Sequence, residues 1–119
     1  MPFSEWQVRD AAGLRSNGSL ALGVAGRCCA LIGPGPLDDE LARAREALDV
    51  ATAAAMPAAR AAAAELAVRA ASALIVASGS RSILANNHAQ RLAREAVFLL
   101  VFATRPAIKE HLSRLLLHI

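Results

Sequence analysis

The sequence predicts an all-α protein, folded as an antiparallel bundle of four to five helices. Alanine, the residue with the highest helix propensity, fills the centre of the chain, where β-branched residues are scarce. Larger apolar residues recur three or four positions apart along most of the rest, which is the spacing of one helix face. The 119 residues are a typical length for one domain. We therefore expect one bundle domain over residues 17–119, preceded by an irregular arm over residues 1–16.

The arm and the first helix differ in pattern. Residues 1–16 lack a sustained helical period, so we expect an irregular arm whose Trp6 packs on the bundle or on a partner. The first helix is predicted from about Gly18 to Leu31, and Gly23 and Gly26 inside it would allow close approach of another helix. Its apolar stripe is Leu20, Val24, Cys28 and Leu31. The two Gly-Pro pairs of residues 33–36 end it.

The second and third helices occupy the alanine-rich centre. Acidic side chains around Asp38 favour a helix start there, because they complement the positive end of the helix dipole. The predicted buried face of this second helix is Leu41, Ala44, Leu48 and Ala51. Pro57 predicts the start of a third helix, and one long helix kinked at Pro57 is the alternative. The third helix is expected to continue to about Ser78, with Leu66, Ala70, Ala73 and Ala77 on one face and Gly79 as its C-cap.

Two shorter helices are predicted to close the bundle. Asn86 or Asn87 is expected to cap the fourth helix, and Thr104 the fifth. The fourth helix would bury Leu92, Ala96, Leu99 and Ala103, while the fifth would bury Ile108, Leu112, Leu115 and Ile119. Phe98 and Phe102 flank the fourth stripe and are expected in the core.

The charge pattern is typical of solvated helix faces. The net charge is +3, and basic residues are interleaved with acidic ones rather than clustered with aromatic readers of bases. The interleaved residues are Arg43, Arg45, Arg60 and Arg69 with Glu40, Glu46, Asp49 and Glu65. Nucleic acid is therefore not an expected partner. The longest apolar run, residues 20–33, is interrupted by Arg27 and is too short to span a bilayer, so no membrane association is expected.

Cysteine and histidine usage indicates the compartment and excludes a metal site. Cys28 and Cys29 are adjacent in an apolar run, where free cysteine behaves as a small buried residue and a disulfide between neighbours would be strained. The three histidines are isolated and lack zinc-site spacing, so no metal ligand is predicted. The N-terminus has no signal-peptide core. We expect a reducing, cytoplasmic location.

The stretch from residue 79 to 109 carries a resemblance to a known family. The glycine turn Gly79-Ser80-Arg81-Ser82 precedes a basic amphipathic helix that contains Arg94-Glu95-Ala96, and another helix starts after Thr104. This order resembles the end of the C-terminal helical-bundle domain of the acyl-CoA dehydrogenase family, in which a glycine turn is followed by an Arg-Asp-Ala helix. The resemblance extends over residues 17–119 and implies the bundle fold of an FAD-dependent oxidoreductase.

The same resemblance implies roles for particular residues. Gly79, Ser80, Arg81 and Ser82 would contact the FAD of a neighbouring subunit, although a C-cap glycine alone also explains Gly79. Many members place their catalytic glutamate where this chain has Ala103, so no catalytic residue is predicted. An Arg-x-x-Phe-Gly segment of the family, which meets the flavin diphosphate, is replaced here by residues 33–36. The family's other two domains are not seen in this sequence.

Two functions from different classes remain open. The first is a non-catalytic or partial oxidoreductase subunit that acts through association with copies of itself or with a larger dehydrogenase subunit, and contributes to an FAD site. The thin alanine core, which leaves an apolar face for a partner, favours association. The alternative is a small homo-oligomeric interaction module without a flavin role. A relative of the flavin-dependent hydroxylases built on the same bundle, which need no carboxylate base, is a third reading.

Overall fold

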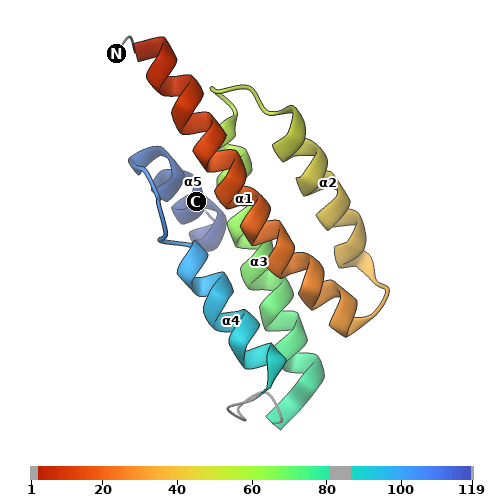
Figure 1. Ribbon diagram of the computed structural model, residues 1–119. Helices are drawn as coiled ribbons and strands as arrows, with labels where there is room; N and C mark the ends of the chain where they lie inside the picture. The colour runs from red at the N-terminus through yellow and green to blue at the C-terminus, as the bar shows by residue number, and fades with distance from the viewer. Residues whose placement is uncertain (1–2, 81–86, 119) are drawn as a thin grey trace.

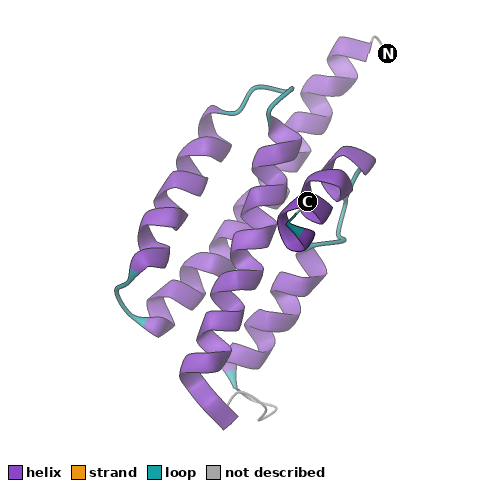
Figure 2. Ribbon diagram, turned by 180° about the vertical axis from the view of Figure 1, so that it is seen from behind, coloured by secondary structure: helices purple, strands orange, loops and turns teal. Residues whose placement is uncertain are grey.

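The computed structural model describes residues 3–80 and 87–118, and every regular element in them is a helix (Figure 2). The five helices are α1 (Phe3–Ile32), α2 (Pro36–Val50), α3 (Met56–Ser78), α4 (His88–Leu99) and α5 (Pro106–Leu117). Helices α1 to α4 lie side by side, and α5 lies beyond the end of α4 (Figure 1). The predicted all-α bundle is confirmed.

Helix α3 is the centre of the bundle, because it packs against each of the other four helices. Its buried residues form a wide face and are mostly small: Met56, Arg60, Ala61, Ala63, Ala64, Leu66, Ala67, Ala70, Ala71 and Leu74. The opposite face, with Ala62, Arg69 and Val76, is exposed. By length and composition α3 could also cross a membrane. That is weak evidence, since a core helix has the same composition, and the packing of α3 against four helices is that of a core helix.

The N-terminal arm is helical, so the prediction of an irregular segment over residues 1–16 is wrong where the structure describes it. Helix α1 begins at Phe3 and runs without a break through residue 16. The buried face of this part starts with Ala11 and Leu14, three positions apart, and a small residue such as alanine hides the helical period. Arg15 also fixes this part, donating to the Leu48 and Ala51 carbonyls at 3.3 and 2.8 Å.

The face of α1 that packs on the bundle differs from the predicted stripe. Cys28 is buried as expected, but Leu20 and Leu31 are exposed and small residues take their place. The buried residues of α1 are Ala11, Leu14, Gly18, Ala21, Leu22, Ala25, Cys28 and Cys29. A Cβ on Gly18 would lie 2.8 Å from Leu48 Cδ1, and one on Gly26 would lie 2.9 Å from Arg45 Nη2. At Gly26 the neighbouring atoms are the ends of the Arg45 and Leu41 side chains of α2, and at Gly23 a Cβ would meet nothing, so the predicted close approach of another helix is not found at Gly23.

Helices α2 and α3 are separate, as Pro57 predicted, and Pro57 lies in the first turn of α3. Of the predicted face of α2, Leu41 and Leu48 are buried, whereas Ala44 and Ala51 are half-buried. The exposed Arg69 of α3 pairs with Glu40 of α2 at 2.9 Å and with Glu65 one turn before it. These three charges lie at the surface as expected.

Arg60 is the exception, and the prediction that it lies on a solvated face is wrong. Its side chain is fully buried, and its Nη2 donates to the carbonyl oxygens of Leu99 at 2.7 Å and Phe102 at 3.1 Å. These carbonyls lie at the C-terminal end of α4, where backbone oxygens lack helical partners and the helix dipole favours a cation. Nε and Nη1 are buried without a partner in the described residues, and burial lowers the Arg60 pKa. Arg60 therefore fastens α3 to the end of α4.

We predict that Arg60→Ala lowers the free energy of unfolding by about 2–4 kcal/mol, because it leaves a cavity and two unpaired carbonyls. Arg27→Ala, at an exposed position of α1, is the control and should change it by less than about 0.5 kcal/mol. Urea denaturation followed by circular dichroism measures both. Equal stability of the two variants would contradict this role of Arg60.

The two cysteines are free and buried, as predicted. Burial, with smaller contributions from Cys29 and Glu95, raises the pKa of the Cys28 thiol to about 11. The unfolded chain therefore loses this proton at lower pH than the folded chain, so the stability contributed by the protonated thiol falls as pH rises above about 9. We predict a fall in melting temperature between these two pH values that is smaller in Cys28→Ala. Identical pH profiles for the two proteins would contradict the raised pKa.

Candidate functional site

The features of the family resemblance lie on α4 and at its two ends. Asn87 caps the start of α4, where its Oδ1 accepts from the Ala89 amide at 2.8 Å. Ala89, Leu92, Ala96 and Leu99 form the buried face of α4. The predicted cap at Asn87 and the inward positions of Leu92, Ala96 and Leu99 are confirmed. Helix α4 therefore packs on the bundle through this face, and its opposite side is exposed.

The glycine turn lies between α3 and α4, and the structure describes its first half. Gly79 has φ 65° and its amide donates to the Ile75 carbonyl, so it is the C-cap of α3. A Cβ on Gly79 would meet no atom within 4 Å. Ser80 is exposed, whereas Arg81 and Ser82 lie outside the described residues. Because the Gly79 amide is already bonded to the Ile75 carbonyl, it is not free to donate to a phosphate.

Ala103 lies in the connection between α4 and α5, and its predicted inward position on α4 is wrong. The helix ends at Leu99, and Ala103 is half-buried with φ 53°, a conformation that is rare for residues other than glycine. Arg105 supports it by donating from Nη1 to the Ala103 carbonyl at 3.0 Å. Thr104 does not cap α5, since its hydroxyl donates to Val101 instead and Arg105 is the N-cap residue.

Arg105 also pairs with the carboxylate of Asp10, an acidic residue of α1. Its Nη2 pairs with Asp10 Oδ1 of α1 at 3.0 Å, and its Nε donates to the same oxygen at 3.1 Å. Abstraction of a proton next to a thioester needs a carboxylate within hydrogen-bond reach of the substrate. The methyl group of Ala103 cannot accept a proton, and the Asp10 carboxylate is held by Arg105. In the described residues this corner is held together by the Arg105–Asp10 pair.

Phe98 and Phe102 are exposed, so the prediction that they lie in the core is wrong. Their exposed fractions are 56% and 41%, and their rings stack on each other with centroids 5.1 Å apart. The physical reason is that α4 buries its Leu92–Leu99 face on α3, and no helix among the described residues covers its other side. We call the exposed residues Val97, Phe98, Val101 and Phe102 the α4 outer face.

A groove of about 470 Å³ adjoins the α4 outer face. We call it the α3–α4 groove, and its lining is Ile75, Gln90, Ala93, Arg94, Val97 and Phe98. Its two polar lining residues, Gln90 and Arg94, both have unpaired polar groups among the described residues. Oε1 of Gln90 is buried without a hydrogen-bond partner, and Arg94 is exposed with no ion pair in the described residues. In the Arg94-Glu95-Ala96 triplet, Ala96 is buried and Glu95 lies 3.8 Å from Arg91.

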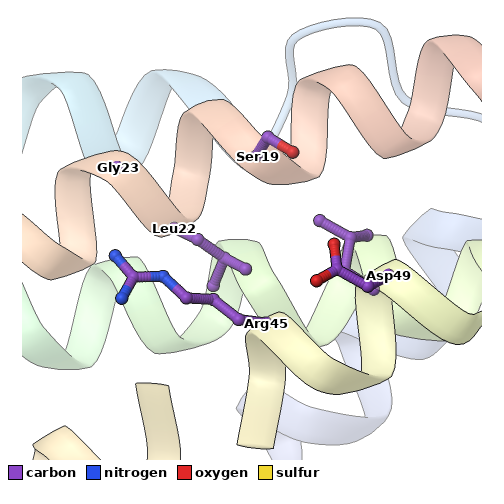
Figure 3. Close-up of a pocket in the computed structure, with 6 residues that line it drawn as sticks. Ser19, Leu22, Gly23, Arg45 and Asp49 are labelled. Atoms are coloured by element: carbon purple, nitrogen blue, oxygen red, sulfur yellow. The ribbon is translucent and has the colours of Figure 1, made fainter. Parts of the chain in front are cut away.

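A second pocket, of about 270 Å³, lies between α1 and α2. It is lined by Ser19, Leu22, Gly23, Arg45, Leu48 and Asp49. Arg45 and Asp49 point away from each other along α2 (Figure 3), and the Ser19 hydroxyl donates to the Arg15 carbonyl of its own helix. No acid–base pair or activated nucleophile is formed there. In residues 3–80 and 87–118, no three His, Cys, Asp or Glu side chains are placed to hold a metal ion.

Comparison with known proteins identifies the bundle. The family described as acyl-CoA dehydrogenase, C-terminal domain, matches residues 36–104, which is more than half of the chain. The chain therefore belongs to this family, whose members are generally associated with FAD. The match starts with α2 and ends just before α5, so it includes the glycine turn, α4 and Ala103. No curated protein and no solved structure matches the chain.

We predict that Gly79→Ala lowers the free energy of unfolding by about 1–2 kcal/mol, because alanine is strained at a left-handed φ. Gly35→Ala is the matched control, since Gly35 is extended at φ 179° and also has open space around it. Urea denaturation should show little change for the control. Full stability of Gly79→Ala would contradict a backbone requirement and would favour a ligand as the reason for this glycine.

Proposed function

We propose that this chain is a non-catalytic or partial subunit of an FAD-associated dehydrogenase assembly, and that it acts by associating with other subunits. The observation that carries the proposal is the α4 outer face, which stays exposed in the folded bundle beside an apolar groove. The alanine at position 103, in the place of a base, supports a role in association over one in proton abstraction.

The size of the apolar surface supports association. Phe98 and Phe102 form one stacked pair, and Val97 and Val101 are 57% and 70% exposed beside it. Burying a fully exposed side chain of this kind contributes about 1.5–3 kcal/mol, and these partly exposed ones would each contribute roughly half of that. Four of them, with the groove, would supply the apolar centre of an interface. The partner under this proposal is another copy of the chain or a larger dehydrogenase subunit, in the cytoplasm and without membrane or nucleic acid.

A contribution to an FAD site is the finer part of the proposal. FAD, when bound to such an assembly, supplies the hydride acceptor. On this chain, the exposed Ser80 with Arg81 and Ser82 would contact phosphate oxygens at the edge of a site held mostly by a partner. Gly79 would then act only by turning the chain, because its amide is bonded to Ile75.

A homo-oligomeric interaction module without flavin is the second candidate. The observation that favours it is that the C-cap geometry of Gly79 accounts for the glycine with no ligand. The two candidate functions are distinguished by measuring the visible absorbance of flavin in the assembly purified from cells. Flavin that travels with the assembly supports the first candidate, and a flavin-free homo-oligomer supports the second.

We predict that Phe98→Glu abolishes association, because it places a charge in the centre of the apolar face. Leu20→Glu is the matched control, since Leu20 of α1 is 57% exposed and Phe98 is 56% exposed. Size-exclusion chromatography with light scattering should give the wild-type mass for Leu20→Glu and the 12.4 kDa monomer for Phe98→Glu. A wild-type mass for both variants, or a wild-type chain that is itself monomeric and binds no partner, would contradict association through this face.

A further inference from the structure

We propose that the α3–α4 groove binds an amphipathic helix of a partner protein whose first turn is acidic, and that Arg94 pairs with its carboxylate. This inference rests on the proposed function, because it names the chemistry of the partner that associates at this face.

The shape of the groove favours a helix as its occupant. Ile75 of α3 and Ala93, Val97 and Phe98 of α4 form an apolar floor between two neighbouring helices. The groove is open to solvent, whereas a small-molecule site buries most of its ligand. An amphipathic helix lays side chains spaced three and four positions apart along such a groove. The stacked Phe98–Phe102 pair extends the apolar floor beyond the groove.

The charges of α4 indicate an acidic partner. Arg94 lines the groove and has no ion pair or hydrogen bond among the described residues. Its neighbour Arg91 is paired with Glu95, so Arg94 is the cation of this face that a partner can neutralise. A carboxylate that docks on the guanidinium forms a charge-assisted hydrogen bond, which is stronger than a neutral one. The complementary helix thus carries an acid at the Arg94 end and apolar residues at the Phe98 end.

Gln90 indicates which part of the helix lies there. Its Oε1 is a buried acceptor with no donor among residues 3–80 and 87–118, and such an unpaired group costs about 1–3 kcal/mol. The first turn of a helix has free backbone amides and favours acidic side chains. When the half-buried Gln90 side chain turns its Oε1 toward the groove, one helix N-terminus can donate to it and offer a carboxylate to Arg94, its neighbour one turn along α4.

A second copy of the chain complements this groove less well. In a two-fold contact the same patch meets itself, so Arg94 of each copy meets a groove whose lining contains no acidic residue to offset it. Such an interface retains an excess of positive charge, and like charges placed together lower affinity. An acidic helix removes that excess.

Two labelled peptides of about five helical turns test the proposal with the full chain, by fluorescence anisotropy. Both carry the same leucine and phenylalanine stripe; one has aspartate and glutamate in its first turn, and the other has lysines there. The wild-type chain should bind the acidic peptide at least about tenfold more tightly, a difference of about 1.4 kcal/mol. Arg94→Glu should reverse this preference. Arg27→Glu, which makes the same charge change at an exposed position of α1, should retain it.

Equal binding of the two peptides, or an Arg94→Glu variant that retains the wild-type preference, would overturn the proposal. A chain that associates with itself through Phe98 but binds neither peptide would show that a second copy occupies the groove. That result overturns this proposal and leaves the proposed function standing. A chain that neither associates nor binds a peptide overturns both.

Discussion

Helix α3 packs against all four other helices through a wide and mostly alanine surface, and this packing constrains how the rest of the chain folds. Alanine contributes little area per residue, so the surrounding helices must come close to gain enough contact. This explains why α1 faces the bundle with alanine, cysteine and Gly18, and why its large Leu20 points to solvent. Helix α1 also packs closely on α2 at Gly18, where an added Cβ would lie 2.8 Å from Leu48 Cδ1.

The end of α4 shows how a charge is kept inside such a core. Arg60 of α3 donates to the Leu99 carbonyl at the end of α4 and to the Phe102 carbonyl in the connection that follows. Arg105 donates to the Ala103 carbonyl of the same connection and pairs with Asp10 of α1. The guanidinium groups of Arg60 and Arg105 thus both donate to the connection between α4 and α5, which contains Ala103. The connection is therefore held by hydrogen bonds from two arginines, although residue 103 itself carries no proton acceptor.

Much of the fold could be predicted from the sequence, because helix limits depend on local chemistry. Pro57, Gly79 and Asn87 each act through their own backbone or side chain, and all three were predicted correctly. The positions of Phe98 and Phe102 depend on whether another helix covers α4, which no local pattern reveals. Arg60 was assigned to the surface from its charge, although its neighbours Met56, Ala63 and Ala64, three and four positions away, are all apolar and buried. That spacing was the available signal for its burial.

Native mass spectrometry of the chain, purified gently from the cells that produce it, shows whether it associates with other subunits. We expect an assembly in which this chain is bound to other subunits, with FAD and a larger dehydrogenase subunit in the same particle. A flavin-free homo-oligomer would retain association and remove the flavin role. A free chain of 12.4 kDa, with no partner at cellular concentrations, would contradict the claim that this bundle acts through association.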